Sequence, residues 1–322
     1  MSPNRIVKKQ DHIAVAMKVG FVEVRRVKKN TYKLIFRLEQ GMELPEVPKS
    51  KNISLVPIRV DKVPFGIDSD GYVVKLPLFT NSGGTNTLIG GNPGQGKTSA
   101  LKIILFGLIE TNTCIIWFDP KAGSDAIPYR ERVNVISNPL EPIEYLKALR
   151  NISSIIYSRN KLVSLGYDIS IFPRIVLFVD EWGTLGNMGS KQDQTEIQSE
   201  LRKIVSIGRS SNVSVVLATQ RPTSANVDVA TRELCNNRVA FQVGDDHGSE
   251  AILGQKGAEN KENPLNPGQA LVWLDGRLVR TNLFSVPQNL TDITSQNIGL
   301  KATLEDLMES DRIFRREHQI ED

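Results

Sequence analysis

Residues 90–100 of the chain read GGNPGQGKTSA and run directly into the apolar segment LKIILFGLI. Within them, GNPGQGKT fits the pattern G-x-x-x-x-G-K-[ST]. Glycines at these positions let successive backbone N–H groups turn inward around phosphate oxygens. The lysine reaches the β and γ phosphates, and the hydroxyl after it can bind Mg²⁺. The stretch therefore predicts a phosphate-binding loop between a strand and a helix.

The predicted nucleotide contacts form one unbroken segment. Its members are Gly91, Asn92, Pro93, Gly94, Gln95, Gly96, Lys97, Thr98 and Ser99. Thr85–Gly90 has the composition of a short strand and Ser99–Ile109 has apolar residues at helical spacing, so the loop has the flanks that such a site requires. The expected ligand is ATP with Mg²⁺, with Thr98 as one metal ligand. An ordinary glycine turn followed by a chance lysine is the alternative.

A second apolar strand is followed by an acidic pair. Arg174–Glu181 reads RIVLFVDE, and its apolar run is typical of a strand buried on both faces of a parallel sheet. Ligands of such sheets bind at the carboxyl ends of the strands. We therefore expect Asp180 to orient Mg²⁺ through its water shell and Glu181 to polarise the attacking water. In isolation, the pair would equally suit a solvated strand end before a turn.

Two further strands also end in polar residues. Val213–Thr219 is followed by Gln220, which we expect to sense the γ phosphate; a polar strand end before a proline loop is the alternative. Thr113–Phe118 runs into Asp-Pro-Lys. Residues 142–165 and 195–206 have helical spacing between these strands. The expected fold class is α/β, doubly wound around a mainly parallel sheet.

Composition limits the class of protein. The chain has 322 residues, of which 40% are hydrophobic, enough for a substantial core. No apolar run approaches the roughly 18 residues of a membrane helix, and the N-terminus lacks a signal-peptide core. A cytoplasmic location is expected. The two cysteines, Cys114 and Cys235, offer neither a disulfide framework nor a cysteine-rich metal site, and a net charge of +4 permits a polyanionic partner without requiring one.

Several short segments resemble one family in their order along the chain. They are DPK at 119–121, VDE at 179–181, GR at 208–209, LATQRP at 217–222, NRVAFQV at 237–243, AILG at 251–254 and GAE at 257–259. Together they resemble the FtsK/SpoIIIE-type DNA translocases of the HerA–FtsK superfamily, over roughly residues 60–286. LATQRP after the two phosphate-site motifs is the most specific element. The resemblance implies a RecA-like P-loop ATPase domain.

The resemblance also implies a hexameric ring that encloses double-stranded DNA and hydrolyses ATP at its subunit interfaces. Such rings use an arginine from the neighbouring subunit, and Arg238 aligns best with that position. Arg209 and Arg221 are rivals, and an ordinary ion pair is the alternative for each. The expected catalytic set is thus Lys97, Glu181, Gln220 and Arg238. In the polar loop 255–266, Lys256 and Lys261 are candidates to face the DNA, although solubility alone would explain them.

The chain also departs from the family pattern. The family commonly has an arginine after the serine that precedes its ILD segment, whereas this chain has Glu250 there. Its segregation members also carry a membrane anchor, a long linker and a winged-helix module, none of which this sequence shows. It looks more like the compact transfer proteins of conjugative plasmids and mobile elements, which implies a membrane-bound docking partner.

The expected domains are a small β-rich domain over 1–55, a motor domain over 56–287 and a tail over 288–322 with one amphipathic helix at Leu300–Glu317. The basic residues among the first thirty are candidates for a nucleic-acid or subunit contact; a solvated polar face is the alternative. Two other functions stay open. One is an ATPase subunit of a protein secretion machine, and the other is a nucleotide-switch coupling protein with little hydrolysis.

Overall fold

The computed structural model describes residues 21–28, 31–37, 61–109, 111, 113–122, 125, 129–220, 222–223, 229–285 and 303–317. The chain divides into two compact units. The smaller comprises Met1–Pro45 and Asn260–Pro264, and the larger comprises Glu46–Glu259 and Leu265–Asp322. The domain boundaries expected after residues 55 and 287 lie outside the described residues.

The smaller unit contains the expected strands. β1 (Phe21–Lys28) pairs antiparallel with β2 (Thr31–Arg37), and Phe21 lies opposite Arg37. Both strands lie within residues 1–55, where the sequence predicted a small β-rich domain. A small β region near the N-terminus is therefore confirmed.

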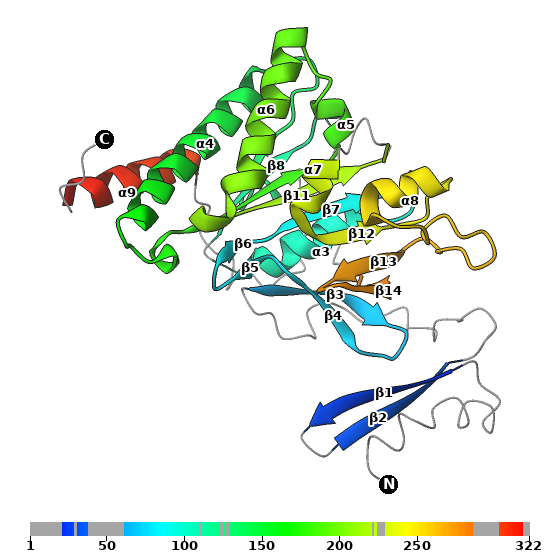
Figure 1. Ribbon diagram of the computed structural model, residues 1–322. Helices are drawn as coiled ribbons and strands as arrows, with labels where there is room; N and C mark the ends of the chain where they lie inside the picture. Colours follow the sequence, from blue (N-terminus) through cyan, green and yellow to red (C-terminus); the bar gives the residue numbers. More distant parts are fainter. Residues whose placement is uncertain are drawn as a thin grey trace. The chain divides into compact units, whose positions relative to one another are not determined.

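The larger unit is built on a ten-stranded sheet (Figure 1). Its strand order is β4-β3-β14-β13-β12-β7-β11-β10-β8-β9. The bounds are β3 Lys62–Asp68, β4 Val73–Pro77, β7 Asn86–Gly90, β8 Thr113–Phe118, β9 Asn134–Ile136, β10 Arg174–Val179, β11 Val213–Thr219, β12 Cys235–Ala240, β13 Gln269–Leu274 and β14 Arg277–Leu283. Two short strands, β5 (Phe79–Thr80) and β6 (Gly83–Gly84), form a separate pair.

The sheet has a parallel half and an antiparallel half. In the parallel half, which comprises β12, β7, β11, β10, β8 and β9, the strands run parallel to one another, and this confirms the expected α/β class. β13, β14, β3 and β4 continue the sheet in antiparallel pairing. Asp275 and Gly276, with φ values of 47° and 77°, form the turn between β13 and β14. This Asp-Gly turn between apolar runs is a hairpin signal, and the expectation of a mainly parallel sheet did not include it.

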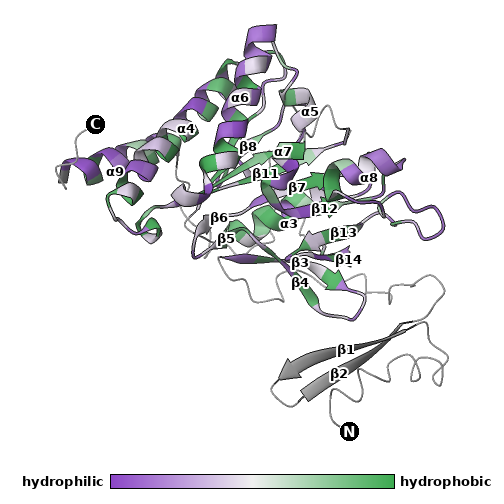
Figure 2. Ribbon diagram, in the orientation of Figure 1, coloured by the Kyte–Doolittle hydropathy of each residue, from purple (hydrophilic) through white to green (hydrophobic). Residues whose placement is uncertain are grey.

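Helices cover both faces of the parallel half. They are α3 Lys97–Leu108, α4 Ile143–Ser164, α5 Trp182–Leu185, α6 Lys191–Ile207, α7 Val229–Glu233, α8 Asp246–Leu253 and α9 Leu304–Glu317. α3 packs on one face, and α4 and α6 pack side by side on the other, with their hydrophilic residues turned away from the sheet (Figures 1 and 2). No helix of the described residues is long and apolar enough to span a membrane.

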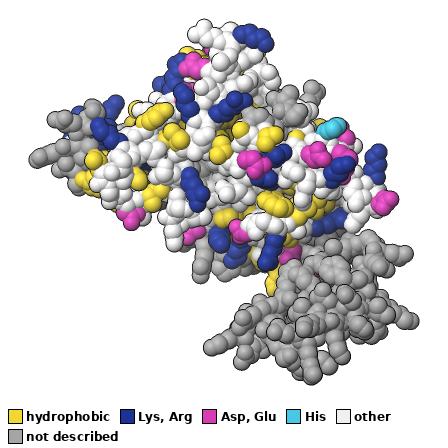
Figure 3. Space-filling view, viewed as in Figure 1, with side chains coloured by type: hydrophobic (Ala, Val, Ile, Leu, Met, Phe, Trp, Pro, Cys, Tyr) yellow, Lys and Arg dark blue, Asp and Glu magenta, His cyan; other side chains and the backbone are white. Residues whose placement is uncertain are grey.

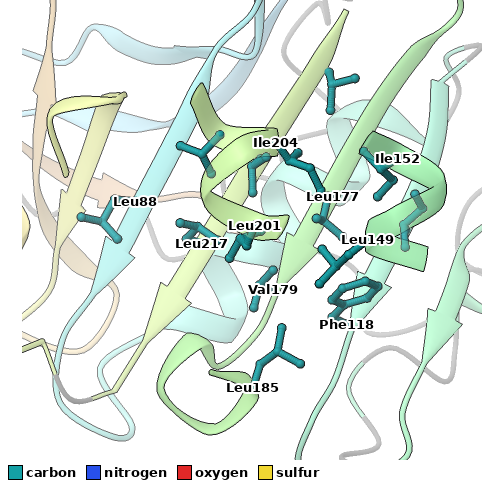
Figure 4. Close-up of a cluster of buried hydrophobic side chains, with 14 of the residues drawn as sticks. Leu88, Phe118, Leu149, Ile152, Leu177, Val179, Leu185, Leu201, Ile204 and Leu217 are labelled. Carbon is teal, nitrogen blue, oxygen red and sulfur yellow. The ribbon is translucent and has the colours of Figure 1, made fainter. Parts of the chain in front are cut away.

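Alternation along β10 separates two hydrophobic clusters. Leu177 and Val179 face α4 and α6, where they pack with residues such as Leu149 and Ile204 (Figure 4). Val176 and Phe178, on the opposite face, pack with α3. All of these side chains are buried. Because both faces of the strand are covered, its sequence is continuously apolar, as the sequence predicted.

The C-terminal helix α9 packs on α4. It begins at Leu304, four residues later than expected, and Leu304 and Leu307 join the cluster on the α4 face of the sheet. Asp311 on α9 accepts a hydrogen bond from Nε of Arg159 at 3.1 Å, and the two side chains are only 7% and 0% exposed. The helix is therefore fixed to the larger unit, to which it belongs, by apolar contacts and a buried ion pair.

Candidate nucleotide-binding site

The strand register brings the predicted polar residues to one edge of the sheet. Val179 of β10 pairs with Phe118 of β8 and with Leu217 of β11. Gly90 of β7 pairs with Thr219 of β11 and with Ala240 of β12. The residues that follow these strands therefore begin at similar levels along one edge. The sequence predicted this grouping from the rule that ligands meet the carboxyl ends of parallel strands.

The phosphate loop lies between β7 and α3, as expected. Gly91, Gly94 and Gly96 have φ values of 151°, 76° and 119°, which only glycine adopts without strain. Gly96 is the N-cap of α3 and provides no side chain to occupy the first N–H groups of the helix. Those groups are directed toward the mouth of the loop, where an anion would be stabilised by them and by the helix dipole.

Two neighbouring segments brace this loop. The N–H of Asn92 donates to the carbonyl of Gln242 at 2.9 Å, and the N–H of Gly268 donates to the carbonyl of Gln95 at 2.9 Å. A Cβ on Gly91 would lie 2.6 Å from Cβ of Phe241, whereas one on Gly94 would meet nothing within 4 Å. The base of the loop is therefore packed and its tip is open, a shape that suits a phosphate cradle.

Lys97 is buried at the mouth of the loop. Its Nζ donates to the carbonyl oxygens of Gly91 at 2.7 Å and Asn92 at 2.6 Å. Burial lowers the pKa of Lys97 to about 8, against the opposing effect of the nearby Glu181 carboxylate. A bound anion would offset the desolvation of this ammonium, so the lysine is suited to binding phosphate.

Glu181 accepts hydrogen bonds from several donors. Its side chain is 6% exposed and receives Lys121 Nζ at 3.0 Å, Thr219 Oγ1 at 3.1 Å and the N–H of Gln220, which lies 3.0 and 3.1 Å from its two oxygens. The structure therefore brings Glu181 and Gln220 together, as the strand ends predicted. The contact with Lys121 was not predicted, because no sequence rule gives the distance between the ends of β8 and β10.

Asp180 and Asp119 carry further acidic groups at this edge. Burial, and next the nearby Asp119 carboxylate, raise the pKa of Asp180 to about 6. Asp119 is 1% exposed; its Oδ1 accepts the N–H of Lys121 at 3.2 Å, while its buried Oδ2 has no hydrogen-bond partner. An unpartnered buried carboxylate oxygen beside a second carboxylate is a donor set that Mg²⁺ prefers.

The residues at this edge thus fit a magnesium–nucleotide complex. Among the residues that the structure describes, no group of three His, Cys, Asp or Glu side chains could hold a metal ion. Mg²⁺ is commonly held by one or two carboxylates together with substrate phosphates and water. Asp180, the Asp119 Oδ2 atom and the Thr98 hydroxyl at the start of α3 are the groups available to such an ion.

Arg238 is held within its own chain. Its side chain is 12% exposed, and its guanidinium donates to the carbonyl oxygens of Cys235 at 3.1 Å and Leu253 at 3.2 Å. Arg232 donates to the carbonyl of Glu250 at 2.9 Å, so both arginines hold the last turn of α8, where helices accept cations. A role for Arg238 in a neighbouring site stays a prediction, and it would require these bonds to break.

The rival arginines are placed differently. Arg209 donates to Ser82 Oγ at 2.6 Å and begins the short turn Arg209–Ser211 that leads into the amino end of β11, whereas Glu181 follows the carboxyl end of β10. Arg221 lies outside the described residues. Of the lysines expected near DNA, Lys256 forms an ion pair with Asp246 and both Lys256 and Lys261 are exposed. Their contact with DNA stays a prediction.

No protein-family model matches the chain. Its sequence is 27% identical over 215 residues to a DNA translocase FtsK of Chlamydia pneumoniae, which covers 58% of this chain and 26% of the relative. It is also 27% identical over 292 residues to a DNA translocase FtsK of Staphylococcus epidermidis, which covers 78% and 35%. The chain is therefore similar in sequence to the FtsK DNA translocases. It spans about a quarter to a third of their length.

Several solved structures share the fold of this chain. The pCW3 conjugation coupling protein TcpA, solved with ATPγS, has a TM-score of 0.67 at 16% identity and covers 96% of this chain and 87% of its own. ATPases 2 and 3 of EssC from Geobacillus thermodenitrificans have a TM-score of 0.59 at 15% identity, with 86% and 52% covered. The type VII secretion ATPase EccC of Thermomonospora curvata has 0.57 at 19%, with 85% and 34% covered. These likenesses place the fold among the P-loop ATPases.

Proposed function

We propose that the chain is an ATP-dependent translocase of double-stranded DNA, a ring-forming motor that acts in plasmid or mobile-element transfer. The observation that carries the proposal is the meeting of the phosphate loop with Glu181 at the carboxyl edge of the sheet, in a relative of FtsK. The loop provides the phosphate cradle and Glu181 provides a buried base. Together they are the parts that ATP hydrolysis requires.

In this proposal each residue has a separate task. The N–H groups at the start of α3 and the Lys97 ammonium bind the β and γ phosphates, while Thr98 and Asp180 hold Mg²⁺. When bound, the ion neutralises charge on the phosphate oxygens. Glu181 accepts a proton from water as the water oxygen bonds to the γ phosphorus. The bond from that phosphorus to the β–γ bridging oxygen breaks, and ADP keeps its electron pair.

Gln220 completes the proposed reaction site. Its backbone N–H fixes Glu181, and its side chain follows directly at the end of β11, where it would contact the γ phosphate or the water. Thr219, the last residue of β11, fixes the Oε1 atom of the same glutamate. Because Thr219 ends a strand buried in the sheet and Gln220 follows it directly, Glu181 is oriented before substrate arrives, which is the arrangement that favours catalysis.

Double-stranded DNA is the proposed substrate because the sequence relatives are DNA translocases and TcpA is a conjugation coupling protein. A translocase that accepts any sequence binds through phosphates, so affinity should fall with salt. On the face shown in Figure 3, Lys and Arg side chains are scattered among acidic ones and do not gather into one patch. A ring, in which several subunits face one duplex, would add their separate weak contacts. A membrane-bound partner is proposed to dock the motor.

A protein-secretion ATPase is the second candidate. Its support is the fold similarity to EccC and EssC, which is nearly as strong as the similarity to TcpA. The same phosphate loop and base would serve it. What distinguishes the two functions is the polymer that stimulates hydrolysis.

The test is ATP hydrolysis by the full chain with and without long duplex DNA, at low and moderate salt, beside Glu181→Gln. The expected result is strong stimulation by DNA that weakens as salt rises and is lost in the variant. Hydrolysis that ignores DNA at every salt concentration would favour the secretion function. Binding of ATP without turnover in the wild type would favour a nucleotide switch.

A further inference from the structure

The turn that follows β8 brings a second lysine to the proposed reaction site. Lys121 Nζ lies 3.0 Å from Glu181 Oε2, and this lysine has no role in the function proposed above. We propose that Lys121 is a positioning residue that links Glu181 to the γ phosphate. The proposal rests on the proposed function of this site as an ATPase and names one further residue that determines its geometry.

The backbone of Lys121 is anchored while its side chain is free to adjust. Its N–H donates to Asp119 Oδ1 at 3.2 Å, and the N–H of Ala122 donates to the carbonyl of Asp119 at 3.2 Å, which closes the turn. The Lys121 side chain is 37% exposed, whereas its partner Glu181 is 6% exposed. A fixed backbone with a partly exposed ammonium lets the head group reorient without moving the sheet.

The three donors to Glu181 come from two different segments. Thr219 ends β11 and Gln220 follows it, and together they hold one carboxylate orientation. Lys121 reaches the same carboxylate from a different strand end. An ammonium has three donors, so it can bond Glu181 and a phosphate oxygen at the same time. The Lys121 ammonium can do so with a single group, and its positive charge is also attracted to phosphate.

The position of Lys121 relative to the other lysine supports this link. Its charge acts on Lys97 strongly enough to contribute to the lowered pKa of that residue, and it also acts on Asp180 in the opposite sense to the carboxylates. Lys121 therefore lies within electrostatic range of Lys97, Asp180 and Glu181 together. These are the groups that would surround the γ phosphate.

The test compares Lys121→Met and Lys121→Arg with a matched control, Lys203→Met on α6. Lys203 pairs with Glu200 at 2.7 Å, and the two side chains are 46% and 12% exposed, similar to the Lys121–Glu181 pair. Turnover and KM for ATP are measured in the otherwise wild-type chain. Affinities for fluorescent ATPγS and ADP are measured by titration in a Glu181→Gln background, where hydrolysis does not interfere.

Lys121→Met should lower kcat about 10- to 100-fold, because the base loses a donor and the transition state loses a charge. It should also lower the preference for ATPγS over ADP about tenfold, since a charge-assisted contact to the γ phosphate is lost. Lys121→Arg should retain part of the turnover and part of the preference for ATPγS over ADP. Lys203→Met should change neither quantity.

Two failures can be told apart. If the wild type binds no ATPγS, the proposed function of the site is wrong and the inference falls with it. If the wild type binds and hydrolyses ATP but Lys121→Met has the kcat and nucleotide preference of Lys203→Met, the proposed function stands and the inference is overturned. A lowered melting temperature with unchanged preference would show that Lys121 has a structural role only, which also overturns it.

Discussion

Two glycines of the phosphate loop, Gly91 and Gly94, have different surroundings, so alanine should cost different amounts of stability at each. Gly91 has φ 151° and a Cβ there would lie 2.6 Å from Cβ of Phe241; Gly94 has φ 76° and open space around it. We expect Gly91→Ala to cost at least about 2 kcal/mol of unfolding free energy and Gly94→Ala about 1 kcal/mol. Urea denaturation checks both.

The two substitutions should affect nucleotide affinity in the opposite order: Gly94→Ala, which costs less stability, should weaken ATPγS binding more. The added methyl of Gly94→Ala would occupy open space at the tip of the proposed phosphate cradle, so we expect this variant to lose ATPγS binding although it stays folded. Stability losses of equal size in the two variants would contradict the packing of the loop base. Unchanged binding in Gly94→Ala would contradict the cradle itself.

The sequence alone predicted those site residues whose type the chemistry of the site requires. A phosphate loop needs glycines and a lysine at fixed spacing, and a base needs a carboxylate at a strand end, so Lys97, Asp180 and Glu181 were found without a structure. Whether they act as expected stays a prediction. Lys121 and the Gly268–Gln95 brace were missed, because both depend on distances between segments that the sequence does not give.

Among the secondary-structure elements, β8 and β12 each bury one cysteine, and this gives a chemical test of sheet integrity. Cys114 is 1% exposed and Cys235 0%, and burial raises the pKa of each thiol to about 12. At pH 8 roughly one thiol in ten thousand is a thiolate, so alkylation should be slow in the folded chain and fast after unfolding. Reactivity should increase with pH toward the raised pKa values. Rapid labelling of the native protein at pH 8 would contradict burial in these strands.

A buried ion pair between Arg159 and Asp311 helps to hold helix α9 in place. Asp311→Ala would leave the Arg159 guanidinium buried without its carboxylate, although the carbonyl oxygens of Pro173 and Ser211 would still accept from it. We expect a loss of about 3 kcal/mol in unfolding free energy. Glu309→Ala on the same helix removes an exposed pair with Arg312 and should cost less than about 0.5 kcal/mol. Equal effects, measured by chemical denaturation, would contradict the buried linkage.

Strands and helices of the parallel half were largely predictable, and the antiparallel half was not. β8 and β11 were predicted to the residue, because their apolar runs are bounded by turns and polar residues. β3 and β4 alternate less regularly, with Pro64 and Gly66 at a register shift, which weakens the period that identifies a strand. The exception is the Asp-Gly turn between β13 and β14, which is a hairpin signal in the sequence itself.

For the whole molecule, the proposed ring predicts that two inactive variants should recover activity when they are mixed. Glu181→Gln lacks the base and Arg238→Ala lacks the proposed trans arginine, so each alone should be inactive. In a 1:1 mixture that exchanges subunits, about a quarter of interfaces would combine an intact base with an intact arginine. Partial recovery of DNA-stimulated hydrolysis is therefore expected.

A mixture with no recovery would place Arg238 outside the neighbouring site. The bonds from Arg238 to Cys235 and Leu253 would then explain its presence, and Arg238→Ala alone should lower the melting temperature. Arg209→Ala and Arg221→Ala can be mixed with Glu181→Gln in the same way. The three mixtures together decide which arginine, if any, acts across an interface.

The braces of the phosphate loop have a mechanical consequence. The loop is tied through Asn92 to the segment after β12 and through Gln95 to the segment before β13, on the side where the sheet becomes antiparallel. Glu181 and Lys121 are anchored on the other side, to β10, β11 and the end of β8. A close-packed sheet resists stretching. The phosphate loop and Glu181 are therefore anchored on opposite sides of β7, so a change in the distance between them would have to deform the sheet.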